Sequence, residues 1–184
     1  CDMRADVFLT DKGPVIISKL QHALHIEFPR GIDPKVRSVE DHIRQYRPDV
    51  FIDACSGPGT LGIIAALAGV REVVMCDVWY ASILCSIVNL KANRKLIGLD
   101  TISLLCQITH LDSVYAGRPK IVCEATGPGV RITVLQGSYE HLKDSIPEGD
   151  RLTAFDPFDK AGFIKNDRFI ASWKEKIGGE VFIP

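Results

Sequence analysis

The chain has 184 residues, of which 46% are hydrophobic and 24% are charged, and its formal net charge is −1. This composition excludes a disordered or fibrous protein, and the near-neutral charge gives no overall basic field of the kind that indicates nucleic-acid binding. The length is that of one domain of ordinary size.

Six cysteines are present without any Cys-x-x-Cys pair, and most of them lie in apolar runs. This usage favours buried free thiols in a reducing compartment, so it predicts a cytoplasmic location and no zinc site. No apolar run reaches the length of a membrane span and no signal peptide is visible, so we expect no contact with a membrane.

We interpret residues 1–48 as an N-terminal extension that takes part in substrate recognition. Three short strands are predicted there, at Asp6–Thr10, Val15–Ser18 and His25–Phe28. A helix is predicted from Val39 to about Tyr46, with Ser38 as its N-cap.

From residue 49 onward, apolar strands alternate with helices. The predicted order is strand, helix, strand and helix, at Val50–Ala54, Thr60–Ala68, Glu72–Cys76 and Ala81–Leu96. Such an order is a βαβα unit with parallel strands and a right-handed crossover. Later strands are predicted at Ser103–Thr109, Lys120–Thr126, Arg131–Gln136, Leu152–Phe155 and Glu180–Ile183, and a later helix at Phe169–Lys176. The whole predicts an open, doubly wound α/β sheet over residues 49–184, with the insert 101–131 forming an extra hairpin before the third main strand.

The turn after the first of these strands has the pattern Gly57-x-Gly59-x-x-Gly62. Glycines let a backbone approach a ligand closely, and the helix that follows presents unpaired N–H groups with partial positive charge. Asp77 ends the next strand, 20 residues after Gly57, where a carboxylate can accept both hydrogen bonds of a ribose diol. The plain alternative is a structural tight turn, but strand, loop, helix and acid together favour an adenosine-type cofactor.

These residues resemble the first two motifs of the class I S-adenosylmethionine-dependent methyltransferases. The family's first motif is an acid followed by a glycine-rich turn, and this chain has Asp53 followed by Ala-Cys-Ser-Gly-Pro-Gly-Thr. The resemblance implies a Rossmann-like, mostly parallel sheet and S-adenosyl-L-methionine as cofactor, with Asp53 near the ammonium group and Asp77 on the ribose. The cofactor-binding residues that it implies are Asp53, Ala54, Cys55, Gly57, Gly59, Thr60, Asp77, Val78, Gly137 and Ser138.

Three details qualify these assignments. An acid such as Asp53 would repel the pyrophosphate of NAD, although a hydrogen-bonded strand end is its structural alternative. Many family members carry an acid after the third-motif glycine, whereas this chain has Ser138, so a backbone group or a hydroxyl would have to contact the adenine. The helix that carries Asn89 and Asn93 resembles the helix that follows the ribose-binding acid in RNA and DNA methyltransferases.

The run Asp156-Pro157-Phe158 falls at the fourth-motif position, and the resemblance makes these three residues the catalytic group. A carboxylate and the Pro157 carbonyl can accept the N–H bonds of an exocyclic amine, and Phe158 can stack on a planar base. The loop is similar to the Asp-Pro-Phe/Tyr-Gly loop of the tRNA guanine-N2 dimethyltransferase group, although Asp159 stands where that group has glycine. The structural alternative is a turn after a strand, with Phe158 in the core.

The sequence therefore predicts a methyltransferase acting on a planar nitrogenous substrate. The first candidate substrate is an amino group of a tRNA base, and the second is a small heteroaromatic metabolite. An NAD(P)-dependent oxidoreductase is a second class, and only Tyr139 with Lys143 has the spacing of its catalytic pair. A non-catalytic nucleotide-binding or partner-binding domain is the third class.

The family's sheet normally continues into an antiparallel hairpin, whereas this chain stops at Pro184. We therefore expect a sheet cut short after its fifth main strand, a partner chain over the sheet edge, or a shifted alignment of the late strands.

Overall fold

The computed structural model describes residues 3–20, 34–109, 114–155 and 167–184. Its main sheet has seven strands within these ranges, namely β3 (Val50–Asp53), β4 (Glu72–Asp77), β5 (Thr101–Leu104), β6 (Lys120–Gly127), β7 (Val130–Gln136), β8 (Arg151–Ala154) and β9 (Glu180–Phe182). Their spatial order is β5-β6-β7-β4-β3-β8-β9. Strands β7, β4, β3, β8 and β9 are parallel to one another, and β6 is antiparallel to both of its neighbours.

This order confirms the doubly wound, mostly parallel sheet. The chain moves from β3 outward through β4 to β7 and then returns to β8 on the opposite side of β3. The antiparallel strands β5 and β6 precede β7, the third main strand, as the insert predicts. The direction of winding reverses between β3 and β8, and ligands of such sheets bind near the reversal, at the carboxyl ends of the strands.

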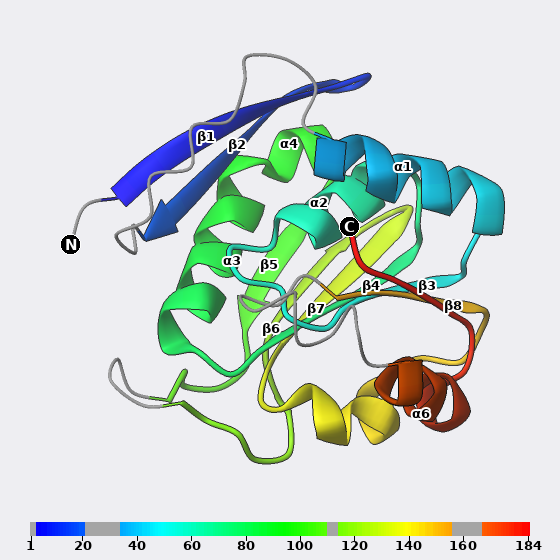
Figure 1. Ribbon diagram of the computed structural model, residues 1–184. Coiled ribbons are helices and arrows are strands. Elements are labelled where there is room, and N and C mark those ends of the chain that lie inside the picture. The colour runs from blue at the N-terminus through cyan, green and yellow to red at the C-terminus, as the bar shows by residue number, and fades with distance from the viewer. Residues whose placement is uncertain (1–2, 21–33, 110–113, 156–166) are drawn as a thin grey trace.

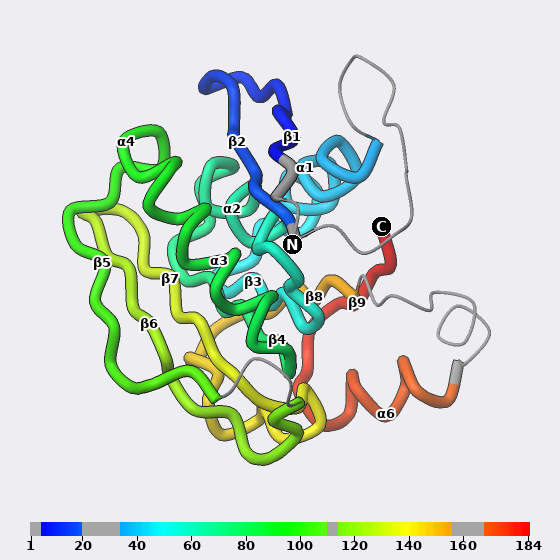
Figure 2. The backbone as a smooth tube through the Cα atoms, turned by 90° about the vertical axis from the view of Figure 1, so that its left-hand side faces the viewer, coloured from blue at the N-terminus to red at the C-terminus, as the bar shows by residue number. Residues whose placement is uncertain are grey.

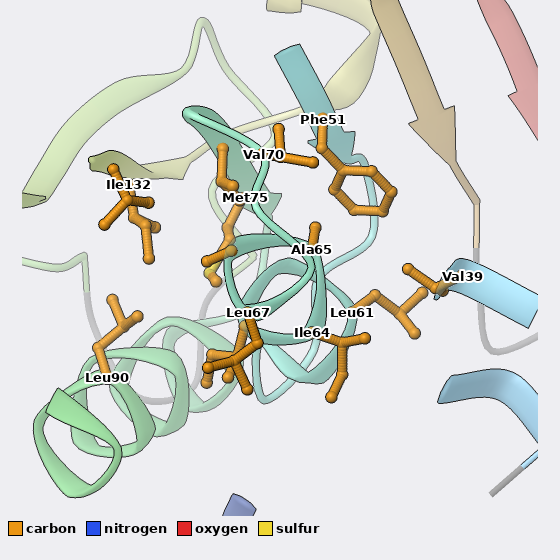
Figure 3. Packing of buried hydrophobic residues seen from close by; sticks show 14 of the residues in the cluster. Val39, Phe51, Leu61, Ile64, Ala65, Leu67, Val70, Met75, Leu90 and Ile132 are labelled. Atoms are coloured by element: carbon orange, nitrogen blue, oxygen red, sulfur yellow. The ribbon is translucent and has the colours of Figure 1, made fainter. Parts of the chain in front are cut away.

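Helices cover both faces of the sheet because its central strands, such as β3 and β4, are buried on both faces. Helices α1 (Pro34–Tyr46), α2 (Thr60–Leu67) and α3 (Tyr80–Ala92) lie on one face, while η1 (Tyr139–Ser145) and α6 (Asp167–Ile177) lie on the other (Figures 1 and 2). Successive residues of a strand point to opposite faces. Phe51 and Met75 accordingly pack against α2, where Figure 3 shows them beside Leu61 and Ala65. Val74 packs in the second cluster, on the α6 side.

An N-terminal hairpin forms a separate two-stranded sheet on the outer side of the first helical layer. It consists of β1 (Met3–Thr10) and β2 (Gly13–Leu20), which confirms both predicted strands (Figures 1 and 2). Phe8, Val15 and Ile17 on its inner face are buried in the same cluster as Val39 of α1. The hairpin and α1 therefore belong to the core of the described domain, and their predicted role in substrate recognition stays a prediction.

Asn89 of α3 and Asn93, which directly follows α3, attach the hairpin. The side-chain amide of Asn93 accepts from the Ile16 N–H at 3.0 Å and donates to the Ile16 carbonyl at 2.8 Å. Asn89 makes the same pair of bonds with Ser18, at 2.8 and 3.0 Å. Residues four apart on a helix rise about 6 Å, close to the roughly 6.6 Å between alternate residues of a strand. The two amides therefore complete the hydrogen bonding of β2 as a neighbouring strand would.

The sequence predicted one continuous helix over Ala81–Leu96, but the structure interrupts it at Asn93. Helix α3 ends at Ala92, and a short helix, α4 (Arg94–Ile97), follows after Asn93, whose φ is −102° and ψ 12°. The Asn93 amide also donates to the carbonyl of Asn89 at 2.8 Å. A side chain bonded to its own helix and to the hairpin competes with regular helical geometry, which accounts for the break.

Three other element predictions need correction. Helix α1 begins at Pro34 and not after Ser38, because proline suits the first helical turn, where its missing N–H is not needed. Strand β5 ends at Leu104, short of the predicted Thr109. The sequence did not predict η1, and the predicted strand His25–Phe28 lies outside the described residues.

Within the described ranges, none of the helices combines the length and the apolar character that crossing a bilayer requires.

Replacing Asn93 with alanine tests its role in attaching the hairpin. We expect Asn93→Ala to lower the free energy of unfolding by about 1–3 kcal/mol, because the N–H and carbonyl of Ile16 lose their partner. Urea denaturation measures the effect, and Lys95→Ala, an exposed change two residues along, is the matched control. Equal stability of the two variants would contradict the attachment.

Candidate functional site

The glycine-rich loop connects β3 to α2 in a conformation that needs glycine. Gly57 and Gly59 have φ angles of 50° and 83°, in the left-handed region that side chains disfavour. The N–H of Ser56 donates to the Cys76 carbonyl at 3.0 Å, and the N–H of Gly59 donates back to the Ser56 carbonyl at 2.8 Å. The loop is thus a tight turn held against the end of β4.

Helix α3 holds two carbonyls of this loop. The Ser86 hydroxyl donates to the Gly57 carbonyl at 2.9 Å, and the Asn89 amide donates to the Pro58 carbonyl at 2.8 Å. Sequence reasoning missed both roles. Ser86, Asn89 and Asn93 are spaced at i, i+3 and i+7, and such a buried polar stripe on one face of a helix is a readable signal.

Asp77 lies beside the loop, as the 20-residue spacing predicts. One carboxylate oxygen accepts from the Gly57 N–H at 2.9 Å, and the other accepts from the Trp79 N–H at 2.9 Å. Burial raises the pKa of Asp77 above its ordinary value, and the hydrogen bonds from Trp79 and Gly57 act in the opposite direction. The Val78 N–H and the Ser82 hydroxyl also hydrogen-bond to Asp77 and lower its pKa, so a diol that binds here shares this carboxylate with donors of the protein.

Asp53 ends β3 and is fully buried. One of its oxygens accepts from the N–H of Gly62 in the first turn of α2, at 3.2 Å. A carboxylate at a helix N-terminus is favoured by the helix dipole. Asp53 therefore has the structural role of a hydrogen-bonded strand end, and its predicted contact with a cofactor ammonium group stays a prediction.

A pocket of about 170 Å³ opens beside the loop. Its lining includes four of the predicted cofactor residues, which are Asp53, Cys55, Gly57 and Thr60. Gly59 instead faces the interior, where an added Cβ would lie 3.1 Å from the Ser86 hydroxyl. The opposite wall comes from the hairpin and α1, through Phe8, Lys19, Lys35 and Val36, and sequence reasoning assigned none of these to the site.

The third-motif residues lie on the other side of Asp77. The Gly137 N–H donates to the Asp77 carbonyl at 3.0 Å, so Gly137 and Asp77 are adjacent at the ends of β7 and β4. The Ser138 N–H donates to the Gly117 carbonyl at 3.1 Å, and the Ser138 hydroxyl accepts from the Glu140 N–H at 3.3 Å. Both groups that the sequence offered to the adenine thus have partners within the protein.

The insert approaches the same edge of the sheet. The Tyr115 N–H donates to the Val78 carbonyl at 3.0 Å, and Trp79 pairs with Val114 in an isolated antiparallel bridge. A Cβ at Gly137 would lie 2.5 Å from the Cα of Pro119, so this glycine allows the insert to pack closely. The sequence predicted the insert as a hairpin but gave no sign that its connecting segment borders Val78.

The predicted catalytic residues Asp156, Pro157 and Phe158 lie outside the described residues. The strand that leads to them, β8, ends at Ala154, which pairs with Asp53 across the winding reversal. The fourth motif therefore follows a strand that ends beside the glycine loop, and its catalytic role stays a prediction.

Comparison with known proteins supports the fold. No protein-family model and no curated protein matches the chain. Among solved structures, the chain is similar to Trm1 from Pyrococcus horikoshii in complex with S-adenosyl-L-methionine, with 14% sequence identity and a TM-score of 0.54. The similarity covers 97% of this chain and 42% of that chain, so the chain spans less than half the length of that protein. At this identity the likeness shows a Rossmann-like, methyltransferase-type fold.

The two loop glycines allow a matched stability test. We expect Gly59→Ala to lower the free energy of unfolding more than Gly57→Ala, because a methyl group added at position 59 would crowd Ser86 and Met75 while the space around Gly57 is open. Both changes carry the cost of a left-handed alanine, about 1–2 kcal/mol. Chemical denaturation measures both, and a larger loss for Gly57→Ala would contradict this packing.

Proposed function

We propose that the protein is a methyltransferase that uses S-adenosyl-L-methionine. The observation that carries the proposal is the junction of Asp77 with the Gly57 N–H at the carboxyl ends of parallel strands, in a fold shared with a protein bound to this cofactor. This junction brings together a diol-binding carboxylate and a loop whose backbone a ligand can approach.

The described residues fit the cofactor at two points. A Cβ built on Gly57 meets nothing within 4 Å, so the loop backbone is open to a ligand on that side. Asp77 lies partly exposed beside this loop, at the carboxyl end of β4, where its carboxylate can bind the ribose hydroxyls. When bound, S-adenosylmethionine supplies an electrophilic methyl group, and the protein's task is to position the acceptor in line with it and exclude water.

We infer a planar nitrogenous acceptor from the Asp156-Pro157-Phe158 run. In this proposal Asp156 and the Pro157 carbonyl accept the N–H bonds of an amino group, and Asp156 takes the proton that the amine loses on methylation. A tRNA base amino group is the first candidate, on the sequence resemblance. A small heteroaromatic metabolite is the second, because the net charge of −1 gives no general attraction to nucleic acid.

The structure weakens the oxidoreductase alternative. The partly buried Tyr139 ring packs edge-to-face against Phe155 at 5.4 Å and Phe169 at 5.8 Å between ring centroids, on the edge of the core at the α6 side. Burial raises the pKa of Tyr139, which is the opposite of what a proton-transferring tyrosine needs. Tyr139 and Lys143 also lie on either side of a kink at His141 in the 3₁₀ segment η1, and not on one continuous α-helix.

Ligand titration tests the proposal. We expect calorimetry to show binding of adenosylhomocysteine and none of NADH. Asp77→Ala should weaken adenosylhomocysteine binding on the order of 10- to 100-fold, the effect of lost hydrogen bonds to a charged group. Asp156→Ala should leave this binding unchanged and abolish methyl transfer.

Thermal unfolding of each variant without ligand serves as the control, because Asp77 also holds Gly57 and Trp79. Binding of NADH in place of adenosylhomocysteine would refute the proposed function. An equal loss of binding in both variants would refute the separate roles of the two acids.

A further inference from the structure

The inner face of the N-terminal hairpin changes character along its length. Alternate residues of a strand share a face, so Val15, Ile17 and Lys19 of β2 point inward together. Val15 and Ile17 are fully buried, but beyond them the inner face carries Lys19, which forms an ion pair with Asp6 of β1. Charges that point inward from a hairpin need polar surroundings, because burying a charge in an apolar core is costly.

Those polar surroundings are the pocket beside the glycine loop. Lys19 from the hairpin and Lys35 from α1 line one wall, and Cys55, Ser56 and Gly57 line the other. The pocket of about 170 Å³ is smaller than the roughly 300–1,000 Å³ that encloses a whole small-molecule ligand. It therefore suits one end of a longer ligand, whose remainder lies outside it.

The charges of the lining point to the chemistry of that end. Two lysines reach the pocket from different elements, so they are not a solvated stripe along one helix. The side chain of Lys19 is only 31% exposed, and that of its partner Asp6 is 15% exposed. Two lysines in the lining of one small pocket suit a carboxylate. The acid Asp53 lines the same pocket, so the lining also suits a neighbouring ammonium group.

We propose that Lys19 and Lys35 bind the α-carboxylate of the donor's amino-acid moiety, and that the N-terminal hairpin is thereby a wall of the donor site. This inference rests on the proposed function and adds the residues that recognise the amino-acid end. Asp6 is a positioning residue, because its ion pair fixes Lys19.

The hydrogen bonds that attach the hairpin to α3 also hold Lys19 at a fixed distance from the glycine-rich loop. The Asn89 amide donates both to the Ser18 carbonyl at 3.0 Å and to the Pro58 carbonyl at 2.8 Å. Ser18 directly precedes Lys19, and Pro58 directly follows Gly57. One buried side chain thus bonds to both walls, which holds the Lys19 backbone in register with the loop.

Two ligands that differ only in the amino-acid end test the inference. Adenosylhomocysteine carries the carboxylate, whereas 5′-methylthioadenosine has the same nucleoside and thioether without it. We expect Lys19→Met and Lys35→Met each to weaken adenosylhomocysteine binding by about 10-fold, the scale of one charge-assisted hydrogen bond. The affinity for 5′-methylthioadenosine should stay within about twofold of the unchanged protein's, because that ligand makes no such bond.

Three variants act as controls. Lys12→Met removes a charge from the turn of the same hairpin, and we expect it to leave both affinities unchanged. Lys19→Arg retains the charge and should restore most of the binding. Because Lys19→Met leaves Asp6 without this partner, the double change Asp6→Asn with Lys19→Met provides a neutral pair if the single variant folds poorly.

Each outcome decides the inference. The inference is supported if the lysine variants bind adenosylhomocysteine more weakly but bind 5′-methylthioadenosine as before, and if the difference in affinity from the unchanged protein becomes smaller at higher salt concentration. Unchanged adenosylhomocysteine binding in a variant that lacks both lysines, or equal loss of both ligands, overturns it while the proposed function stands. If the unchanged protein binds neither ligand, the proposed function and this inference both fall.

Discussion

The polar stripe of α3 is the constraint on which the site depends. Ser86, Asn89 and Asn93 are buried, and buried polar side chains must find hydrogen-bond partners. Their partners are the carbonyls of Gly57 and Pro58 and the backbone of Ile16 and Ser18. A single helix face therefore joins the glycine loop to the N-terminal hairpin. Apolar side chains of similar volume at these three positions would fill the same space. They would leave the backbone groups of the loop and of the edge of β2 without hydrogen-bond partners.

Much of the fold was predictable because its signals are local. Short apolar runs that end at Gly57 and Asp77 specify parallel strands, and parallel strands bring their carboxyl ends to one edge of the sheet. Hence the sequence placed Gly57 and Asp77 at the same edge of the sheet, whereas the hydrogen bond between them is a finding of the structure. The break at Asn93 did not follow, because its cause is Ile16, a residue 77 positions away along the chain. The same reason hid Lys19, whose place at the pocket depends on how the hairpin packs on α3, and Lys35, whose place depends on how α1 packs in the core.

The insert shows a second limit of sequence reasoning. Its strands were predictable from their composition, but the connection between β5 and β6 has no regular pattern that fixes its path. The path follows from backbone bonds of Tyr115 to Val78 and of Ser138 to Gly117. These hydrogen bonds are made by backbone N–H and C=O groups, and every residue except proline has both. The identity of the side chains therefore does not predict them. The insert consequently borders the residue that the methyltransferase resemblance gives to the adenine.

Electrostatics distinguish between the ligands that such a crevice can hold. Two acids lie beside the loop, Asp53 at the end of β3, which is fully buried, and Asp77 at the end of β4, which is partly exposed. Burial, and then the negative charge of Asp77, raises the pKa of the neighbouring Cys76 thiol well above its usual range. A dinucleotide would bring two more negative charges to the loop. A sulfonium donor brings a positive centre and an ammonium group, and its one carboxylate can lie in the pocket that Lys19 and Lys35 line. The distribution of charge around the loop thus favours the donor over the dinucleotide, even though a glycine pattern of this kind serves both.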